Sequence, residues 1–137
     1  MALKLNSNLQ NPFMDKKLQN LALQFLVEKQ NYIVEKDKTL IGFSGEEYNV
    51  SFHLQGKKGF QTKLSTAIFI IDYKKSIGTD VINKYSRIGQ DLDHIVNKIL
   101  IIGNDFSVPA QNMAEKAGIL LLERGELISL LVSNNFI

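Results

Sequence analysis

The first periodic segment of the sequence has its apolar residues at helical spacing. Between Asp15 and Gln30 the apolar side chains fall at i, i+3, i+4, i+7 and i+8, which places them on one stripe of a helix. Asp15 can cap the first turn, and Asn31 can end the helix because asparagine tolerates the left-handed conformation. Residues 1–14 are polar and aperiodic, and we interpret them as an N-terminal arm. The stripe consists of Leu18, Leu21, Ala22, Phe25 and Leu26.

A period of two then replaces the helical spacing. Residues 32–35 and 39–43 are short runs with β-branched side chains, and Lys36-Asp37-Lys38 between them is typical of a turn. Residues 48–54 alternate between apolar and polar, which predicts a strand with one apolar face. Residues 67–74 are apolar on both faces, which indicates a strand in the middle of a sheet. The apolar face of residues 48–54 is formed by Val50, Phe52 and Leu54.

Helices and strands alternate in the second half of the chain. Thr79 or Asp80 is expected to cap one helix, and a second helix starts at Ser107 and stops at Gly118. Residues 98–102 and 119–122 are buried strands, and a short helix follows Gly125. The whole order is α-β-β-β-β-α-β-α-β-α. Because antiparallel strands come first and helical crossovers later, the order predicts an α/β fold with a mixed β-sheet flanked by helices on both faces.

Composition restricts the class of protein more than it identifies it. The 137 residues suit one domain, which we place at residues 15–137. There is no apolar run of about 18 residues and no apolar signal core, so we expect a cytoplasmic protein. The absence of cysteine excludes disulfides and thiol nucleophiles. The net charge is only +2, so any surface that binds nucleic acid must be a local one.

Asp72 and Lys74 form the most informative chemical pair, with Tyr73 between them. Because side chains alternate along a strand, Asp72 and Lys74 are expected to point to one face, about 6.5–7 Å apart. A carboxylate can hold Mg²⁺, and a lysine beside it can help to activate water and offset the charge of a phosphate. A metal-dependent phosphodiesterase needs this pairing. The same tripeptide is also common at solvated strand ends.

Several further motifs occur around this pair in a fixed order. Asn31-Tyr32 follows the first helix, and Gly42-Phe43-Ser44-Gly45-Glu46-Glu47-Tyr48 is a glycine-rich turn into a strand. Ile71-Asp72-Tyr73-Lys74 ends the central strand, and residues 99–122 form a strand-helix-strand unit. Together these motifs, over residues 15–131, resemble the Mrr-type restriction endonucleases of the PD-(D/E)xK nuclease superfamily. The resemblance implies a restriction-endonuclease-like fold, Mg²⁺ as cofactor, DNA as substrate, a homodimer, and catalytic roles for Asp72 and Lys74.

Two acidic positions of that family are neutral in this chain. The metal-binding aspartate of the strand after the glycine turn falls at Ser51, and a glutamate of the first helix falls at Gln19. Serine cannot replace a carboxylate as a strong Mg²⁺ ligand. Three explanations remain open: Glu46 or Glu47 completes the metal site with Asp72, the site is weakly active with one carboxylate, or catalysis is lost and nucleic-acid binding is kept. We take Glu47 as the candidate second ligand.

Basic residues near these motifs are candidate DNA contacts, although each also suits a solvated surface. His53 shares the predicted face of Ser51, and we expect it to be a surface residue. The leading hypothesis is a Mg²⁺-dependent DNA endonuclease or a nuclease-like DNA-binding protein. The alternatives are a catalytically inactive binding or assembly module and a Holliday-junction-type resolvase. The candidate DNA contacts are Lys57, Lys58, Lys63, Lys75, Lys84 and Arg87.

Overall fold

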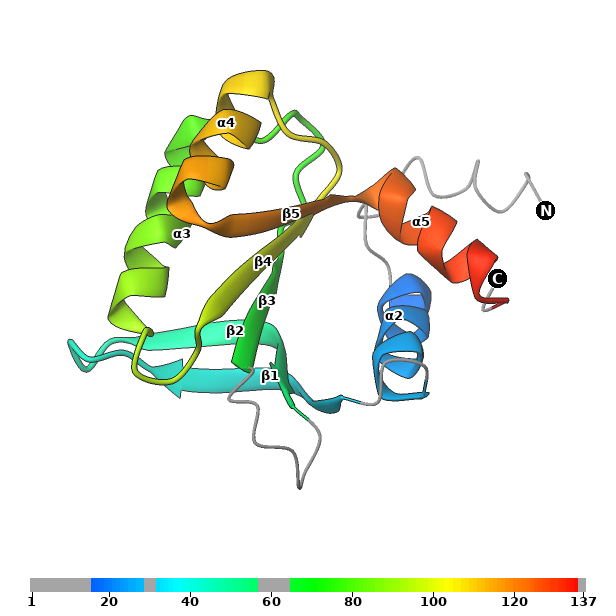
Figure 1. Cartoon of the computed structure of the whole chain (residues 1–137), viewed down its shortest axis with the longest axis horizontal. Coiled ribbons are helices and arrows are strands. Elements are labelled where there is room, and N and C mark those ends of the chain that lie inside the picture. The colour runs from blue at the N-terminus through cyan, green and yellow to red at the C-terminus, as the bar shows by residue number, and fades with distance from the viewer. Residues whose placement is uncertain (1–15, 29–31, 57–64, 136–137) are drawn as a thin grey trace.

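Four helices and five strands make up the described part of the chain (Figure 1). The computed structural model describes residues 16–28, 32–56 and 65–135. The predicted arm 1–14 and the predicted helix ends at Asp15, Gln30 and Asn31 lie outside these residues. No helix in the described ranges is long and apolar enough to cross a membrane. In chain order the elements are α2 (Lys16–Glu28), β1 (Ile33–Ile41), β2 (Glu47–Gln55), β3 (Ser65–Ile70), α3 (Thr79–Asp91), β4 (Lys98–Gly103), α4 (Val108–Ala117), β5 (Ile119–Glu123) and α5 (Arg124–Ser133).

The strands form one mixed sheet in the order β1-β2-β3-β4-β5. β1, β2 and β3 are antiparallel neighbours, while β3, β4 and β5 run parallel. α3 joins β3 to β4, and α4 joins β4 to β5, because parallel neighbours need a crossover connection. β3 is the central strand and is buried at Thr66, Ala67, Ile68 and Phe69. The predicted mixed sheet is therefore confirmed.

Helices cover both faces of the sheet, and each face has its own apolar cluster (Figure 1). On one face, Ile82 of α3 and Ala110 of α4 pack with Ala67 and Phe69 of β3. Leu92, in the turn that ends α3, belongs to the same cluster. On the other face, residues of α2 and α5 pack with Phe52 and Ile68. Burial of both faces is what makes β3 a continuous apolar run in the sequence.

Sequence signals at the helix ends agree with the structure for α4. The Ser107 hydroxyl accepts a hydrogen bond from the Ala110 N–H at the start of the helix, and Gly118 ends it in the left-handed conformation with φ of 74°. The start of α3 differs from the expectation. Its N-cap is Gly78, with no side-chain hydrogen bond, and Thr79 is the first helical residue.

Residues 33–41 form one strand, so the prediction of two short strands around a turn at residues 36–38 was wrong. Asp37 has a φ of 51°. Its neighbours Lys36 and Lys38 pair with Phe52 and Val50 of β2, whereas Asp37 does not pair with Ser51 between them. A left-handed residue thus replaces the predicted turn while both neighbouring segments stay paired to β2. This explains why the order has one strand fewer than predicted.

The sheet face of β2 changes at the same place. Val50 packs in the α3 and α4 cluster, whereas Phe52 and Leu54 pack in the α2 and α5 cluster. The prediction that these three side chains share one face was therefore wrong. β1 changes with it, because Leu40 belongs to the first cluster and Val34 packs against the second. Ser51, opposite Asp37, marks this change along β2.

The turn between β1 and β2 is held against the C-terminal end of α3. The Asp91 carboxylate accepts hydrogen bonds from the Ser44 N–H at 2.8 Å, the Ser44 hydroxyl at 2.6 Å and the Tyr48 hydroxyl at 2.7 Å. The Phe43 N–H also donates to the Asp91 backbone carbonyl at 2.8 Å. A Cβ atom at Gly42 would overlap Asp91 Oδ2, so only glycine leaves room for this carboxylate. These contacts fix the start of β2 beside α3.

Candidate nucleic-acid interface

The Asp72-Tyr73-Lys74 segment lies just beyond the central strand. β3 ends at Ile70, and the Ile71 N–H still donates to the Ile102 carbonyl at 2.9 Å. Asp72, Tyr73 and Lys74 follow as exposed residues outside the strand. The prediction of a strand up to Lys74 was therefore too long, and strand alternation cannot be used to place Asp72 and Lys74 on one face. Both side chains are accessible at the edge of the molecule.

Ser51 takes part in the backbone hydrogen bonding of the sheet. Pairing between β2 and β3 stops at Phe52 and Ile68, where β2 changes face. The Ser51 hydroxyl then accepts a hydrogen bond from the Ile70 N–H at 3.1 Å. A side chain, rather than the main chain of β2, satisfies this N–H at the end of the central strand. The position that would hold a metal-binding acid is thus occupied by a hydroxyl with a structural partner.

The two glutamates that could replace the missing acid face other groups. Glu46 Oε2 lies 2.8 Å from the Tyr48 hydroxyl and shares its single hydrogen with Asp91, and Glu47 lines a groove beside α3. Within residues 16–28, 32–56 and 65–135, no group of three or more histidine, aspartate or glutamate side chains is arranged to hold a metal. Mg²⁺ in nucleotide-processing sites is usually held by one or two carboxylates together with waters and substrate phosphates. Ser51, whose hydroxyl accepts the Ile70 N–H, supplies no carboxylate to the Mg²⁺ site that the family resemblance implies.

The groove lies between the start of β2 and the exposed side of α3. It has a volume of about 530 Å³ and is open to solvent. Glu46, Glu47 and Asn49 line it from β2, and Lys84 and Arg87 line it from α3. Lys84 and Arg87 are two of the predicted DNA contacts, whereas the groove itself was not predicted. Tyr48, Phe69, Tyr85 and Ile88 complete the lining.

Aromatic side chains connect the groove to the Asp72-Tyr73-Lys74 segment. The half-buried Tyr85 ring packs on Phe69 with 4.8 Å between ring centroids, and Lys84 Nζ lies 5.6 Å from the Tyr85 centroid. Burial raises the pKa of Tyr85. Phe69 of β3 lines the groove, and the Asp72-Tyr73-Lys74 segment begins three residues after it. The groove and the end of the central strand form neighbouring parts of one surface.

The other predicted basic contacts cannot be joined to this surface in the same way. Lys57, Lys58 and Lys63 lie outside the described residues. Lys75 is exposed in the bend that follows Lys74. Of the six basic candidates, the structure brings together Lys84 and Arg87 in the groove.

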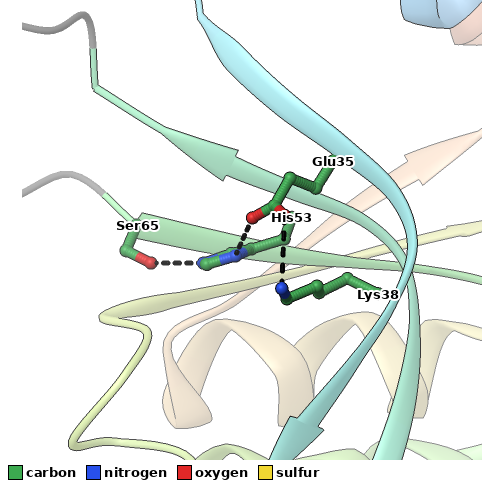
Figure 2. Close-up of polar contacts among 4 residues, drawn as sticks. All are labelled: Glu35, Lys38, His53 and Ser65. Atoms are coloured by element: carbon green, nitrogen blue, oxygen red, sulfur yellow. Dashed lines mark hydrogen bonds and ion pairs between the residues drawn. The ribbon is translucent and has the colours of Figure 1, made fainter.

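His53 is buried, with only 3% of its surface exposed, so the expectation of a surface residue was wrong. Figure 2 shows its ring between Ser65, at 2.8 Å from Nε2, and Glu35, at 3.9 Å from Nδ1. Nδ1 has no hydrogen-bond partner among the described residues, and Glu35 instead pairs with Lys38 at 3.2 Å. Burial lowers the pKa of His53, opposed by the charge of Glu35, so the ring is neutral at pH 7. It lies toward the opposite end of β2 from the groove.

Comparison with known proteins bears on the fold. No family model matches the sequence, and neither does any curated protein. The protein of unknown function AF1548 has a similar structure, with a TM-score of 0.65 and 17% identity over 86% of this chain and 66% of that protein. A repair endonuclease from Pyrococcus abyssi is also similar, with a TM-score of 0.53 and 11% identity over 80% of this chain and 46% of that protein. The chain spans less than two thirds of either protein, and at such identities the similarity shows the fold alone. That fold is restriction-endonuclease-like.

Proposed function

We propose that this protein binds DNA through a nuclease fold that has lost its hydrolytic metal site. The proposal retains part of the Mrr-type resemblance, namely the fold and the nucleic-acid partner. It assigns the loss of hydrolysis to Ser51 on β2. Asp72 and Lys74 then remain as exposed polar residues beside the binding surface.

The observation that carries the proposal is the environment of Ser51. Its hydroxyl is a neutral group that already accepts the Ile70 N–H at 3.1 Å. Glu46 is hydrogen bonded to Tyr48, and Glu47 lines the groove with Lys84 and Arg87. Ser51 is thus hydrogen bonded within the sheet, and the two candidates for the second metal ligand, Glu46 and Glu47, line the groove. A site with Asp72 as its one carboxylate would hold Mg²⁺ weakly.

Binding is supported by the position of Lys84 and Arg87. Both are exposed, both lie on the same side of α3, and both line the groove, whose lining includes Phe69 near the end of β3. Lysine and arginine that contact phosphates supply most of the affinity of nonspecific DNA binding. Lys84 and Arg87 supply two positive charges on the α3 side of the groove, opposite Glu46 and Glu47 on its β2 side, so we assign the attraction for phosphate to the α3 side.

The test measures binding and cleavage on the same substrates. Duplex, single-stranded and branched DNA are each incubated with the protein in Mg²⁺ or Mn²⁺, with Lys74→Ala as the control for contaminating nucleases. We expect binding to DNA, and no cleavage above the level of the control. Metal-dependent cleavage that Lys74→Ala abolishes would overturn the loss of hydrolysis. Absence of binding to all three substrates would overturn the DNA partner.

A further inference from the structure

A serine, a histidine and a glutamate lie in a row across three strands of the sheet (Figure 2). His53 of β2 pairs directly with Glu35 of β1. Ser65 begins β3, two residues before Ala67, which is the β3 partner of His53. Because side chains two residues apart on a strand share a face, all three side chains lie on one face of the sheet. None of them lines the groove beside α3.

The Ser65 hydroxyl is placed to give its proton to His53. Ser65 Oγ lies 2.8 Å from His53 Nε2. The neutral ring carries one hydrogen, on either of its two nitrogens. Glu35 Oε1, 3.9 Å from Nδ1, favours the hydrogen on Nδ1, because a carboxylate attracts an N–H and repels a lone pair. Nε2 then carries the lone pair that accepts the Ser65 hydrogen.

The environment of Nδ1 suits a ring that gains a positive charge. His53 is buried, and its Nδ1 has no hydrogen-bond partner among the described residues. Glu35 is exposed, and its Oε2 pairs with Lys38 at 3.2 Å, so that Oε1 faces the ring. When Nε2 takes up a proton, attraction between the ring and Glu35 increases. A serine nucleophile, a histidine base and an orienting carboxylate use this order of groups.

The serine backbone is fixed by Asn97, which lies between α3 and β4. The Asn97 N–H donates to the Ser65 carbonyl at 2.9 Å, and Asn97 Oδ1 accepts the Ser65 N–H at 3.2 Å. Ser65 is partly exposed, whereas His53 behind it is shielded from water. A small substrate can therefore reach the hydroxyl while the base stays buried.

We infer that Ser65 is a nucleophile toward carboxylic esters with a good leaving group, and that His53 is its general base. Glu35 is the positioning residue of this base. Ser65 Oγ forms a bond to the carbonyl carbon while its proton moves to His53 Nε2. The bond between that carbon and the leaving alcohol then breaks, and Nε2 returns the proton to the alcohol. Water attacks the acyl-serine in the same way, which releases the acid and restores Ser65. This activity does not depend on DNA binding.

A fluorophosphonate probe tests the nucleophile, because an activated serine forms an Oγ–P bond with it and releases fluoride. Peptide mass spectrometry should locate the label at Ser65 in the folded protein, and urea should abolish labelling. Ser65→Ala should remove the label, and Ser76→Ala, at an exposed serine before α3, should not. His53→Gln should slow labelling about a hundredfold, as loss of a general base does. Hydrolysis of p-nitrophenyl acetate should follow the labelling in all three variants.

The pH profile of labelling tests the role of Glu35. Neutral His53 is the base, so the rate should fall as the pH is lowered through the pKa of its ring. Burial lowers this pKa, the charge of Glu35 raises it, and the charge of Lys38 lowers it. Glu35→Gln should therefore move the fall in rate to lower pH. Glu115→Gln, at an exposed site on α4, should leave the profile unchanged.

Three results would overturn the inference. The first is labelling of Ser65 no faster than that of Ser76, and the second is labelling that survives in urea. The third is an unchanged rate in a His53→Gln variant that keeps the circular dichroism of the wild type. If that variant does not fold, the wild-type profile decides, because a rate that stays constant at low pH excludes His53 as the base. Ser65→Ala should bind DNA as the wild type does, so failure of the inference and failure of the proposed function are distinguishable.

Discussion

Ser51 has a role in stability at the scale of a single residue. Replacing it with alanine removes the acceptor of the Ile70 N–H at the end of the central strand. We expect Ser51→Ala to lower the free energy of unfolding by about 1–3 kcal/mol, the usual effect of leaving a backbone donor without its partner. Urea denaturation measures this change. DNA affinity should stay the same, because Ser51 does not line the groove.

Ser76→Ala is the matched control for this substitution. Ser76 is exposed in the segment before α3, so its loss should change stability by no more than about 0.5 kcal/mol. If both variants are equally stable, the hydrogen bond from the Ile70 N–H does not contribute to the free energy of unfolding. If Ser51→Ala instead abolishes DNA binding, Ser51 belongs to the binding surface and our assignment is wrong.

His53 makes stability depend on pH. Burial lowers the pKa of its ring in the folded state, while in the unfolded chain the ring has its ordinary pKa of 6.5. Below about pH 6.5 the unfolded state therefore binds a proton that the folded state does not. As the pH is lowered, the free energy of unfolding decreases by up to about 1.4 kcal/mol per pH unit. Above this pH the ring is neutral in both states, and this contribution disappears.

Unfolding measured at about pH 7.5 and about pH 5.5 tests the role of His53. His53→Gln can keep the hydrogen bond to Ser65 but does not titrate, so the difference in stability between the two pH values should shrink. An undiminished difference in His53→Gln would mean that other groups cause the pH dependence.

At the scale of elements, Asp91 joins the β1–β2 turn to α3. Hydrogen bonds from the Ser44 and Tyr48 hydroxyls and from the Ser44 N–H lower the pKa of Asp91. Its carboxylate is therefore charged in the folded state at neutral pH. The stabilisation is present above the ordinary aspartate pKa of 3.8 and is lost as the pH falls through the lower folded pKa.

We expect Asp91→Ala to release the turn while the rest of the sheet stays folded. The amide hydrogen of Ser44, which donates to the Asp91 carboxylate, should exchange faster with solvent, and amides of β4 should not. Hydrogen exchange followed by NMR at neutral pH measures both. Asp93→Ala, which removes a nearby exposed acid, is the control. Unchanged exchange at Ser44 would show that other contacts hold the turn.

Elements that depend on local signals were the ones that the sequence predicted well. The start of α4 at Ser107 and its end at Gly118 follow from capping and left-handed geometry within a few residues. The change of face at Ser51 and the left-handed Asp37 inside β1 depend on pairing between two strands, which no local pattern contains. The end of β3 at Ile70 depends likewise on where its neighbours stop.

The same distinction explains what could be foreseen of the site. Asp72, Lys74, Lys84 and Arg87 were identified as candidates by residue type and order along the chain. The groove was not predicted, because it joins β2 to a helix almost forty residues later and exists only after packing. Burial of His53 also depends on β1 and β3, which enclose it.

At the scale of the whole molecule, charge must be concentrated locally for DNA binding to occur. The net charge of +2 provides little general attraction. Lys84 and Arg87 lie together in the groove, whereas Lys98 and Lys116 are exposed at the start of β4 and the end of α4. The two pairs carry equal charge, so comparing them separates the position of the charge from its amount.

The salt dependence of duplex binding tests the central claim most directly. Each phosphate contact contributes about 0.9 to the slope of log affinity against log salt concentration. We therefore expect the double variant Lys84→Ala/Arg87→Ala to bind more weakly and to reduce that slope by roughly 2. The variant Lys98→Ala/Lys116→Ala should keep the wild-type slope. Equal loss of slope in both variants, or no loss in either, would contradict a DNA-binding surface at the groove beside α3.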